Sequence, residues 1–79
     1  MKYKCICCGY KTMDNENPLN HDICPVCYWE NDPVQNNNPD YSGGANDVSL
    51  SKARENYKVF GAIEDRFIQF VRKPFTDES

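Results

Sequence analysis

The stretches CICC, residues 5–8, and CPVC, residues 24–27, decide how this chain folds. Each places two cysteines at C-x2-C spacing, and fifteen residues separate the first pair from the second. A tight turn with two intervening residues directs two sulfurs at one point, so two such turns can supply four thiolates to one tetrahedral ion. The pattern therefore predicts a metal site whose ligands are Cys5, Cys8, Cys24 and Cys27.

Zinc is the expected ion, because a redox-inert ion held by four thiolates suits the stabilisation of a small fold. Iron is the alternative. The start of the chain, MKYKCICCGY, together with the later CPVC, resembles rubredoxin, in which four cysteines hold one iron for electron transfer. The two cysteine pairs are much closer in sequence here than in rubredoxin, and the second pair lacks the usual following glycine.

The residues around the two cysteine pairs predict how each turn closes. Gly9 comes directly after Cys8, where a turn that presents two sulfurs needs a residue free to adopt positive φ. Tyr28 takes the equivalent place after Cys27, so we expect the second turn to close differently. Pro25 fixes φ inside that second turn.

Two further residues with metal-binding or redox chemistry are close to these turns in sequence. Cys7 is left over from the four ligands, and we expect a bystander thiol, with redox or metal-exchange chemistry as the alternative. His21 precedes Cys24 by three residues and could replace one thiolate. Because four well-spaced cysteines are already present, we expect this histidine to be solvated instead.

The size of the chain explains why a metal would be needed. With 79 residues, of which 39% are hydrophobic and 13% aromatic, the protein has one small core that depends on a few large rings. A structural zinc site contributes on the order of 10 kcal/mol to folding, which matches or exceeds the net stability of a small domain. We therefore expect the metal-free chain to be largely unfolded.

Hydropathy and charge exclude several classes of protein. No apolar run approaches the roughly 20 residues that cross a bilayer, and the start, MKYKCICC, lacks the long apolar stretch of a signal peptide. We expect a cytoplasmic protein that does not bind membranes, in a reducing compartment where clustered thiols bind metal rather than form disulfides. The formal net charge of −3 disfavours a protein that coats nucleic acid.

We expect one metal-binding domain over residues 1–74 and a frayed tail over residues 75–79. The domain divides into a cysteine-bearing half (1–30), a loop (31–48) and a helical part (49–73). The loop is rich in Asn, Asp, Pro and Gly, which favour turns over any regular element. A flexible spacer is the favoured interpretation of this loop, and an ordered binding loop is the alternative.

Local patterns predict the secondary structure. Short alternating stretches around Lys2–Lys4 and Tyr10–Thr12 predict small strands. Ser49 can cap a helix that Gly61 ends. The apolar face of this helix is Leu50, Ala53, Tyr57 and Phe60. A second helix before Pro74 would bury Ile63, Phe67, Phe70 and Val71. We expect a small metal-stabilised α+β fold, in which zinc-ribbon-like or rubredoxin-like hairpins carry the cysteine turns and one or two C-terminal helices cover one side.

The expected working surface is acidic and carries aromatic rings, features that suit recognition of another protein. Residues 1–48 hold three basic and seven acidic side chains, a charge of −4. The expected partner-binding residues are Tyr28, Trp29, Glu30, Asp32 and Tyr41. Packing over the metal, as part of the core, is the alternative for Tyr10, Tyr28 and Trp29.

An enzyme would need an acid/base set, and the chain offers only a weak one. Glu30, Asp32, Asp40 and His21 could act in hydrolysis or hold a second, harder metal ion. Carboxylates in turns rich in Asn and Pro usually cap local structure instead. A zinc ion closed by four thiolates has no open position for water, so we expect no catalytic activity.

Nucleic-acid binding is an alternative function that the basic residues of the helical part would carry. Residues 49–79 hold six basic and five acidic side chains, a charge of +1. The candidate basic face comprises Lys52, Arg54, Lys58, Arg66, Arg72 and Lys73. A solvated helix surface is the more usual role of such charges.

The chain resembles the cysteine-rich CPCC family of small, mainly bacterial proteins. The resemblance rests on CICCGY, ICPVCYWENDPVQ, PDYSGGAND, SLSKARENY, FGA and VRKP, and runs from about Cys5 to Pro74. Ile6 stands where the family has the proline that gives it its name, so the first turn is less rigid while the ligand spacing is kept. The resemblance implies a metal-binding mini-domain with the same four cysteine ligands, and it implies no reaction.

Overall fold

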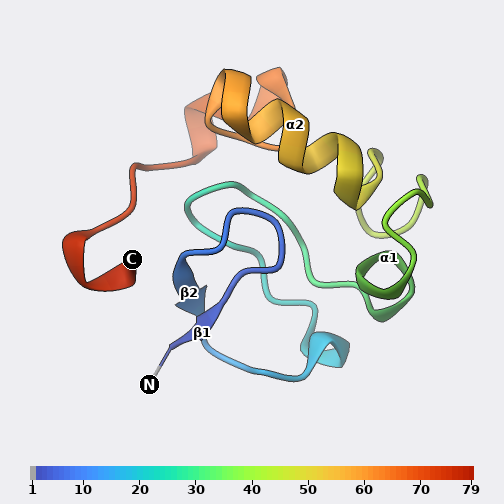
Figure 1. The fold of residues 1–79 in the computed structure, drawn as a ribbon, viewed down its shortest axis with the longest axis horizontal. Helices are drawn as coiled ribbons and strands as arrows, with labels where there is room; N and C mark the ends of the chain where they lie inside the picture. Colours follow the sequence, from blue (N-terminus) through green and yellow to red (C-terminus); the bar gives the residue numbers. More distant parts are fainter. Residues whose placement is uncertain (1) are drawn as a thin grey trace.

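In the computed structural model, which describes residues 2–79, both cysteine turns lie beneath one helix (Figure 1). The first turn joins two antiparallel strands, β1 (Tyr3–Lys4) and β2 (Lys11–Met13). An isolated antiparallel bridge between Ile23 and Glu30 closes the second turn. The predicted strands and the small α+β class are confirmed.

Helix α2 (Leu50–Phe60) begins and ends at the residues that the sequence predicts. The Ser49 hydroxyl accepts the N–H of Lys52 at 3.1 Å, and Gly61 adopts φ 77° with its N–H bonded to the carbonyl of Tyr57. Leu50 is fully buried, whereas Phe60 is 41% exposed. Ala53 is also buried and Tyr57 packs against the core while partly exposed, so burial decreases along the predicted apolar face toward its C-terminal end.

The second predicted helix is replaced by a shorter 3-10 helix, η2 (Asp65–Phe70). Backbone groups on either side of η2 bond to the second cysteine turn. The N–H of Ile63 donates to the carbonyl of Cys27 at 2.9 Å, and the N–H of Arg72 donates to that of Pro25 at 3.1 Å. The two N–H groups are thereby used in bonds to the second turn. Ile63 and Arg72 are held against that turn and are not part of one continuous α-helix over 63–73.

The segment 31–48 differs from the expected flexible loop, because it contains a short helix, α1 (Pro33–Asn37). The Asp32 carboxylate caps α1 by accepting the N–H groups of Val34 at 2.8 Å and Gln35 at 3.3 Å. Pro33 occupies the first helical turn, where its missing N–H costs nothing. Outside this segment, the 3-10 helix η1 (Pro18–Asn20) lies between β2 and the second cysteine turn.

The remainder of this segment is organised around the buried side chain of Gln35, which is 0% exposed. Its amide Nε2 donates to the carbonyls of Tyr41, Asn46 and Val48 at 3.0–3.2 Å. Its Oε1 accepts from the backbone N–H of Asn46 at 2.9 Å and from the side-chain Nδ2 of Asn46 at 3.0 Å. The segment is therefore an ordered loop, which is the alternative that the sequence left open.

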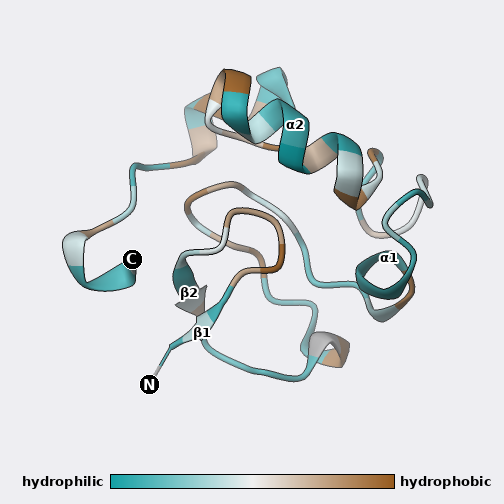
Figure 2. Ribbon diagram, viewed as in Figure 1, coloured by the Kyte–Doolittle hydropathy of each residue, from teal (hydrophilic) through white to brown (hydrophobic). Residues whose placement is uncertain are grey.

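The core is a compact cluster that surrounds the cysteines. Figure 2 shows hydrophobic residues concentrated on the two cysteine turns and hydrophilic residues on α1 and its surroundings. Among the buried members are Cys5, Met13, Cys24, Val26, Cys27, Trp29, Leu50, Ala53 and Ile63. Within the described part of the chain, no helix has the length and apolar character to cross a membrane.

The last residues, expected to fray, instead form a turn that we call the C-terminal clasp (72–79). Its 3-10 helix η3 (Thr76–Glu78) lies close to β2. The Arg72 guanidinium makes two hydrogen bonds of 2.8 Å to the Glu78 carboxylate and lies over the ring of Phe75. Glu78 is only 8% exposed. An ion pair and an aromatic contact therefore hold residues that their composition alone would leave mobile.

We expect Glu78→Gln to release the clasp. The hydrogen bonds from Arg72 lower the pKa of Glu78 to about 2. A carboxyl group whose pKa falls on folding stabilises the fold above its unfolded pKa, and this contribution is lost as pH falls toward 2. At neutral pH, carboxypeptidase should remove the last residues of E78Q faster than those of the wild type. Equal rates for the variant, the wild type and the exposed control Glu16→Gln would contradict the clasp.

Candidate metal centre

The first cysteine turn is closed by two backbone hydrogen bonds. The N–H of Cys5 donates to the carbonyl of Tyr10, and the N–H of Gly9 donates to the carbonyl of Cys5, both at 2.8 Å. Gly9 has φ 82°, in the left-handed region. The predicted role of this glycine is confirmed.

The second turn has the same pair of bonds, so the expectation that it closes differently is wrong. The N–H of Cys24 donates to the carbonyl of Trp29 at 2.9 Å, and the N–H of Tyr28 donates to the carbonyl of Cys24 at 2.8 Å. Tyr28 adopts φ 76° despite its Cβ, a conformation that costs roughly 1–2 kcal/mol outside glycine. Its ring lies 4.6 Å from that of Phe67, centroid to centroid. Aromatic packing of this kind offsets the backbone strain.

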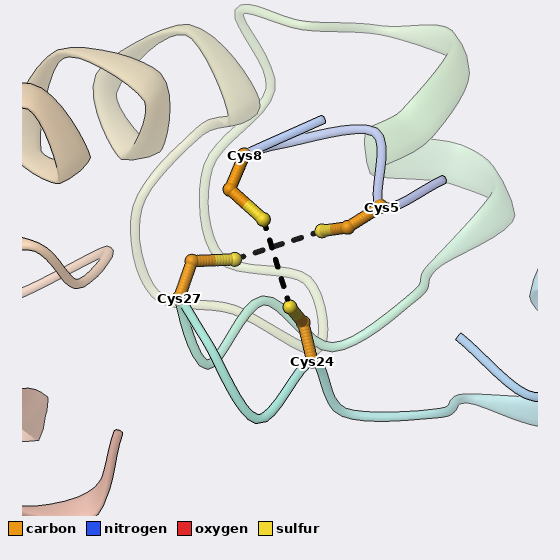
Figure 3. Close-up of side chains that lie close together, drawn as sticks. All are labelled: Cys5, Cys8, Cys24 and Cys27. Carbon is orange, nitrogen blue, oxygen red and sulfur yellow. Dashed lines mark hydrogen bonds between the residues drawn. The ribbon is translucent and has the colours of Figure 1, made fainter. Parts of the chain in front are cut away.

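The two turns bring the four predicted ligand sulfurs together, all within 4.8 Å of one another. The sulfurs of Cys5 and Cys27 are 3.6 Å apart and those of Cys8 and Cys24 are 3.7 Å apart. Figure 3 shows that these two separations cross, as opposite edges of a tetrahedron do. An ion with tetrahedral metal–sulfur bonds of about 2.3 Å would separate each sulfur pair by about 3.8 Å. The residues therefore fit one tetrahedral metal ion.

Neighbouring groups donate hydrogen bonds toward the sulfurs. The Thr12 hydroxyl lies 2.9 Å from the sulfur of Cys24, and the Trp29 backbone N–H donates to the sulfur of Cys27 at 3.4 Å. Hydrogen bonds of this kind disperse thiolate charge and orient metal ligands. Three of the four cysteines are at most 1% exposed, and Cys8 is the one partly open to solvent.

The cysteines strongly influence one another's protonation. Hydrogen bonds from the other three thiols, with that of Cys27 foremost, lower the pKa of Cys24. The interaction with Cys24 is in turn the main factor that raises the pKa of Cys5, Cys8 and Cys27. These opposing shifts mean that the four cysteines resist ionising together. A divalent ion supplies the positive charge that lets all four ionise.

The other candidate ligands lie outside this group. Cys7 is 9% exposed and belongs to the core cluster. His21 is half-exposed, with its Nδ1 3.5 Å from a carboxylate oxygen of Glu30. Within residues 2–79, the four cysteines form the only group of three or more His, Cys, Asp or Glu residues arranged to hold a metal ion.

Burial corrects part of the expected partner surface. Trp29 is 0% exposed and Asp32 only 9%, so neither can form the centre of a contact with another protein. The Trp29 ring packs in the core, as the alternative interpretation held, and its Nε1 donates to Oδ1 of Asn36 at 3.0 Å. Tyr41 is 48% exposed, and Tyr28 and Glu30 are partly exposed.

The carboxylates considered for acid/base chemistry each have a local partner. The pKa of Asp32 is lowered chiefly by the backbone N–H of Ala45, with help from the N–H groups that it caps at the start of α1. Asp40 accepts the hydroxyl of Ser51 at 3.3 Å. Asp32 therefore caps a helix and Asp40 links the loop to the start of α2, which are structural roles.

Gly9→Ala is expected to destabilise the metal-loaded protein by about 1–2 kcal/mol, because it places a Cβ at positive φ. Apart from its two neighbours in the chain, an added Cβ would meet no atom of the described residues within 4 Å, so the loss would come from backbone strain. Gly9→Asn should recover much of this loss, since asparagine tolerates the left-handed region. Denaturant unfolding at saturating zinc measures both. Equal losses for the alanine and asparagine variants would show that strain is not the cause.

The model of the protein family described as "Cysteine-rich CPCC" matches residues 3–78, nearly the whole chain. The match includes both cysteine turns, the ordered loop, α2 and most of the C-terminal clasp. No curated protein matches the chain.

Proposed function

The chain belongs to the cysteine-rich CPCC family, and from that premise we propose that it is a structural-zinc mini-protein of the zinc-ribbon type that acts as a protein-interaction module. The observation that carries the proposal is the set of four sulfurs, all within 4.8 Å of one another and fitted to one tetrahedral ion. The two turns, each closed by the same pair of backbone bonds, are the feature that it would share with zinc ribbons.

Zinc is preferred to iron because of the place of the site in the fold. The sulfurs lie at the centre of the hydrophobic cluster, where a stable, redox-inert ion would link the N-terminal turns to α2 and η2. Thiolate sites also accept iron, so electron transfer of the rubredoxin kind is the alternative. Protein from iron-replete growth would then be red and show a reversible redox couple, whereas colourless protein with one zinc per chain supports the proposal.

A structural role also fits the coordination. Four thiolates saturate a tetrahedral zinc ion, so water would have no position on it at which to be activated. The carboxylates near the second turn are engaged in caps and loop ties. We therefore propose that the protein acts by binding and does not catalyse a reaction, and that it works in a reducing compartment such as the cytoplasm.

The proposed partner is another protein, and the proposed surface is the exposed part of the loop that follows the second turn. Tyr41 is 48% exposed and belongs to a loop that Gln35 holds in one conformation, so its ring is presented at little entropic cost. Tyr28 and Glu30 are partly exposed on the chain before the same loop. The −4 charge of residues 1–48 favours a partner with a basic surface.

Nucleic-acid binding is less well supported, because internal contacts engage four of the six basic residues in question. Arg66 pairs with Asp47 and Glu64, and Arg72 pairs with Glu78. Lys52 pairs with Glu55, and the Arg54 guanidinium donates to the carbonyl of Ile6. Binding that falls steeply with added salt would revive this alternative.

The test uses the zinc-loaded protein, immobilised at physiological salt, to capture proteins from native lysate. A partner that binds the wild type and the exposed control Leu19→Ser, but is lost with Tyr41→Ser, would support the proposed surface. Leu19 is 66% exposed and lies in η1, outside the loop. Failure to capture any protein above background, or capture that is indifferent to Tyr41→Ser, would contradict the proposed interaction role.

A further inference from the structure

A cavity of about 500 Å³ lies beside the first cysteine turn, a volume typical of sites for small ligands. Three separate segments contribute its lining residues: β1 with the first turn, the chain before η1, and α1 with Asn31, the residue before its cap. Figure 1 shows where β1, η1 and α1 lie in the fold. Its lining residues include Tyr3, Ile6, Gly9, Asn15, Asn31 and Asn36.

A chain of hydrogen bonds fixes the orientation of one amide in this wall. The indole Nε1 of Trp29 can only donate, and it donates to Oδ1 of Asn36 at 3.0 Å. The Nδ2 of Asn36 must then point the other way, and it donates to Oδ1 of Asn31 at 3.2 Å. The Nδ2 of Asn31 is therefore a donor at the end of the chain, and it has no acceptor within the described residues.

Asn31 is 7% exposed, so an unused donor on its side chain needs an explanation. Among the described residues, no fully enclosed side-chain nitrogen or oxygen lacks a partner. The Nδ2 of Asn31 must therefore reach open space, and the cavity is the space that Asn31 lines. A ligand there would meet a preoriented N–H donor held by the core.

The opposite polarity is supplied by Asn15, which also lines the cavity. Its backbone N–H and its Nδ2 both donate to the same carboxylate oxygen of Asp22, at 3.1 and 3.0 Å. Because a carboxylate only accepts, this pairing leaves Oδ1 of Asn15 as an acceptor to which no donor among residues 2–79 is bonded. The wall therefore offers one donor and one acceptor, the two kinds of partner that the C=O and the N–H of an amide group need.

Charge argues against an anionic ligand. Cys5 lines the cavity, residues 1–48 carry −4, and four thiolates around a divalent ion would add −2. Lys4 and Glu16 in the wall carry opposite charges and offset one another. The ring of Tyr3 and the side chain of Ile6 offer apolar surface to the rest of the ligand.

We propose that this cavity binds a neutral amide of an extended peptide segment that carries an apolar side chain. The peptide C=O accepts from Nδ2 of Asn31, the peptide N–H donates to Oδ1 of Asn15, and the apolar side chain packs on Tyr3 and Ile6. This inference rests on the proposed interaction role, because it takes the ligand to be part of a protein. The proposed peptide contact differs from the proposed partner surface. It uses Asn31, which precedes α1, whereas the partner surface is centred on Tyr41, which follows α1.

The experiment titrates ¹⁵N-labelled, zinc-loaded protein with N-acetyl-leucine N-methylamide and follows amide resonances by NMR. We expect saturable shifts at the Asn31 side-chain amide and at the backbone of Tyr3 and Gly9. Asn31→Asp keeps the acceptor that Asn36 uses and replaces only the free donor, so it should weaken binding by about tenfold or more. Asn37→Asp is the matched control, since Asn37 is exposed at the end of α1 and undergoes the same change of charge.

A second variant guards against a defect in the folding of N31D. Asn15 is exposed, so Asn15→Ala should leave the fold unchanged. It should weaken the binding of the capped peptide, N-acetyl-leucine N-methylamide, by about threefold. Nicotinamide, tested in parallel, distinguishes a free small amide from a peptide, because binding of nicotinamide alone would overturn the peptide as the source. No saturable shift with the capped peptide, or equal affinity for the wild type, N15A and N31D, would also overturn the proposal. Neither result would affect a partner captured through Tyr41, so the two proposals fail separately.

Discussion

Cys24→Ser is expected to unfold the protein at neutral pH, the largest effect of any single substitution considered. The sulfur of Cys24 is 0% exposed and lies 3.7 Å from that of Cys8 and 2.9 Å from the Thr12 hydroxyl. A serine hydroxyl stays protonated and is a poor zinc ligand, so three thiolates would remain. A structural zinc site contributes on the order of 10 kcal/mol, comparable with the whole stability of a small domain. Loss of the near-UV circular dichroism and of stoichiometric zinc measures the effect.

The matched control is Cys7→Ser. Cys7 lies in the first turn, between the ligands Cys5 and Cys8, and is 9% exposed, but its sulfur is outside the four-sulfur group. We expect this variant to bind one zinc per chain and to melt within a few degrees of the wild type. If C7S lost zinc as completely as C24S, or if C24S kept both zinc and its melting temperature, the assignment of the ligands would be wrong.

Gln35→Glu is the second substitution with a large expected effect. The Nε2 of Gln35 donates to three carbonyls, and a carboxylate in its place would direct negative charge at all of them. Because the side chain is 0% exposed, water cannot compensate. Gln35→Met removes the same bonds without a charge and should cost about 3 kcal/mol or more, as each unsatisfied buried group costs about 1–3 kcal/mol. We expect Gln35→Glu to cost more than Gln35→Met in denaturant unfolding at saturating zinc.

The control for this pair is Gln69→Met, an equal change at an exposed position of η2. It should change the free energy of unfolding by less than about 0.5 kcal/mol. Hydrogen exchange adds a local measurement, since the N–H of Asn46 donates to Oε1 of Gln35 and should lose its protection in Gln35→Met, which has no such acceptor. A Gln35→Met variant as stable as Gln69→Met would show that the buried amide does not organise the loop.

The sequence was sufficient where structure depends on local spacing. The C-x2-C pairs bring their own sulfurs together through tight turns, and the structure needs only to place one turn against the other. Ser49 and Gly61 bound α2 because capping and positive φ act within one helical turn. The short strands follow from the first turn, which reverses the chain between them.

The sequence was insufficient where contacts between residues far apart in the chain determine the local structure. The periodicity of 63–73 suits a helix, but backbone bonds to the second turn fix its two ends and leave only η2. The turn puts Tyr28 at positive φ, as the first turn does Gly9, and contacts with the distant rings of Phe67 and Phe70 let a residue other than glycine occupy that place. Asn and Gln in a loop are usually expected to be exposed to solvent. Here Gln35 and Asn46 are buried, and Oε1 of Gln35 accepts hydrogen bonds from both the side chain and the backbone of Asn46.

The measurement that tests the central claim most directly is removal of the metal from the purified wild-type protein. Trp29 is 0% exposed and packs beside the cysteine cluster, so its near-UV signal reports whether the core is intact. A strong chelator should abolish this signal together with the thermal transition, and one equivalent of zinc should restore both. A metal-free protein that kept its near-UV spectrum and its melting temperature would contradict the claim that one ion organises this fold.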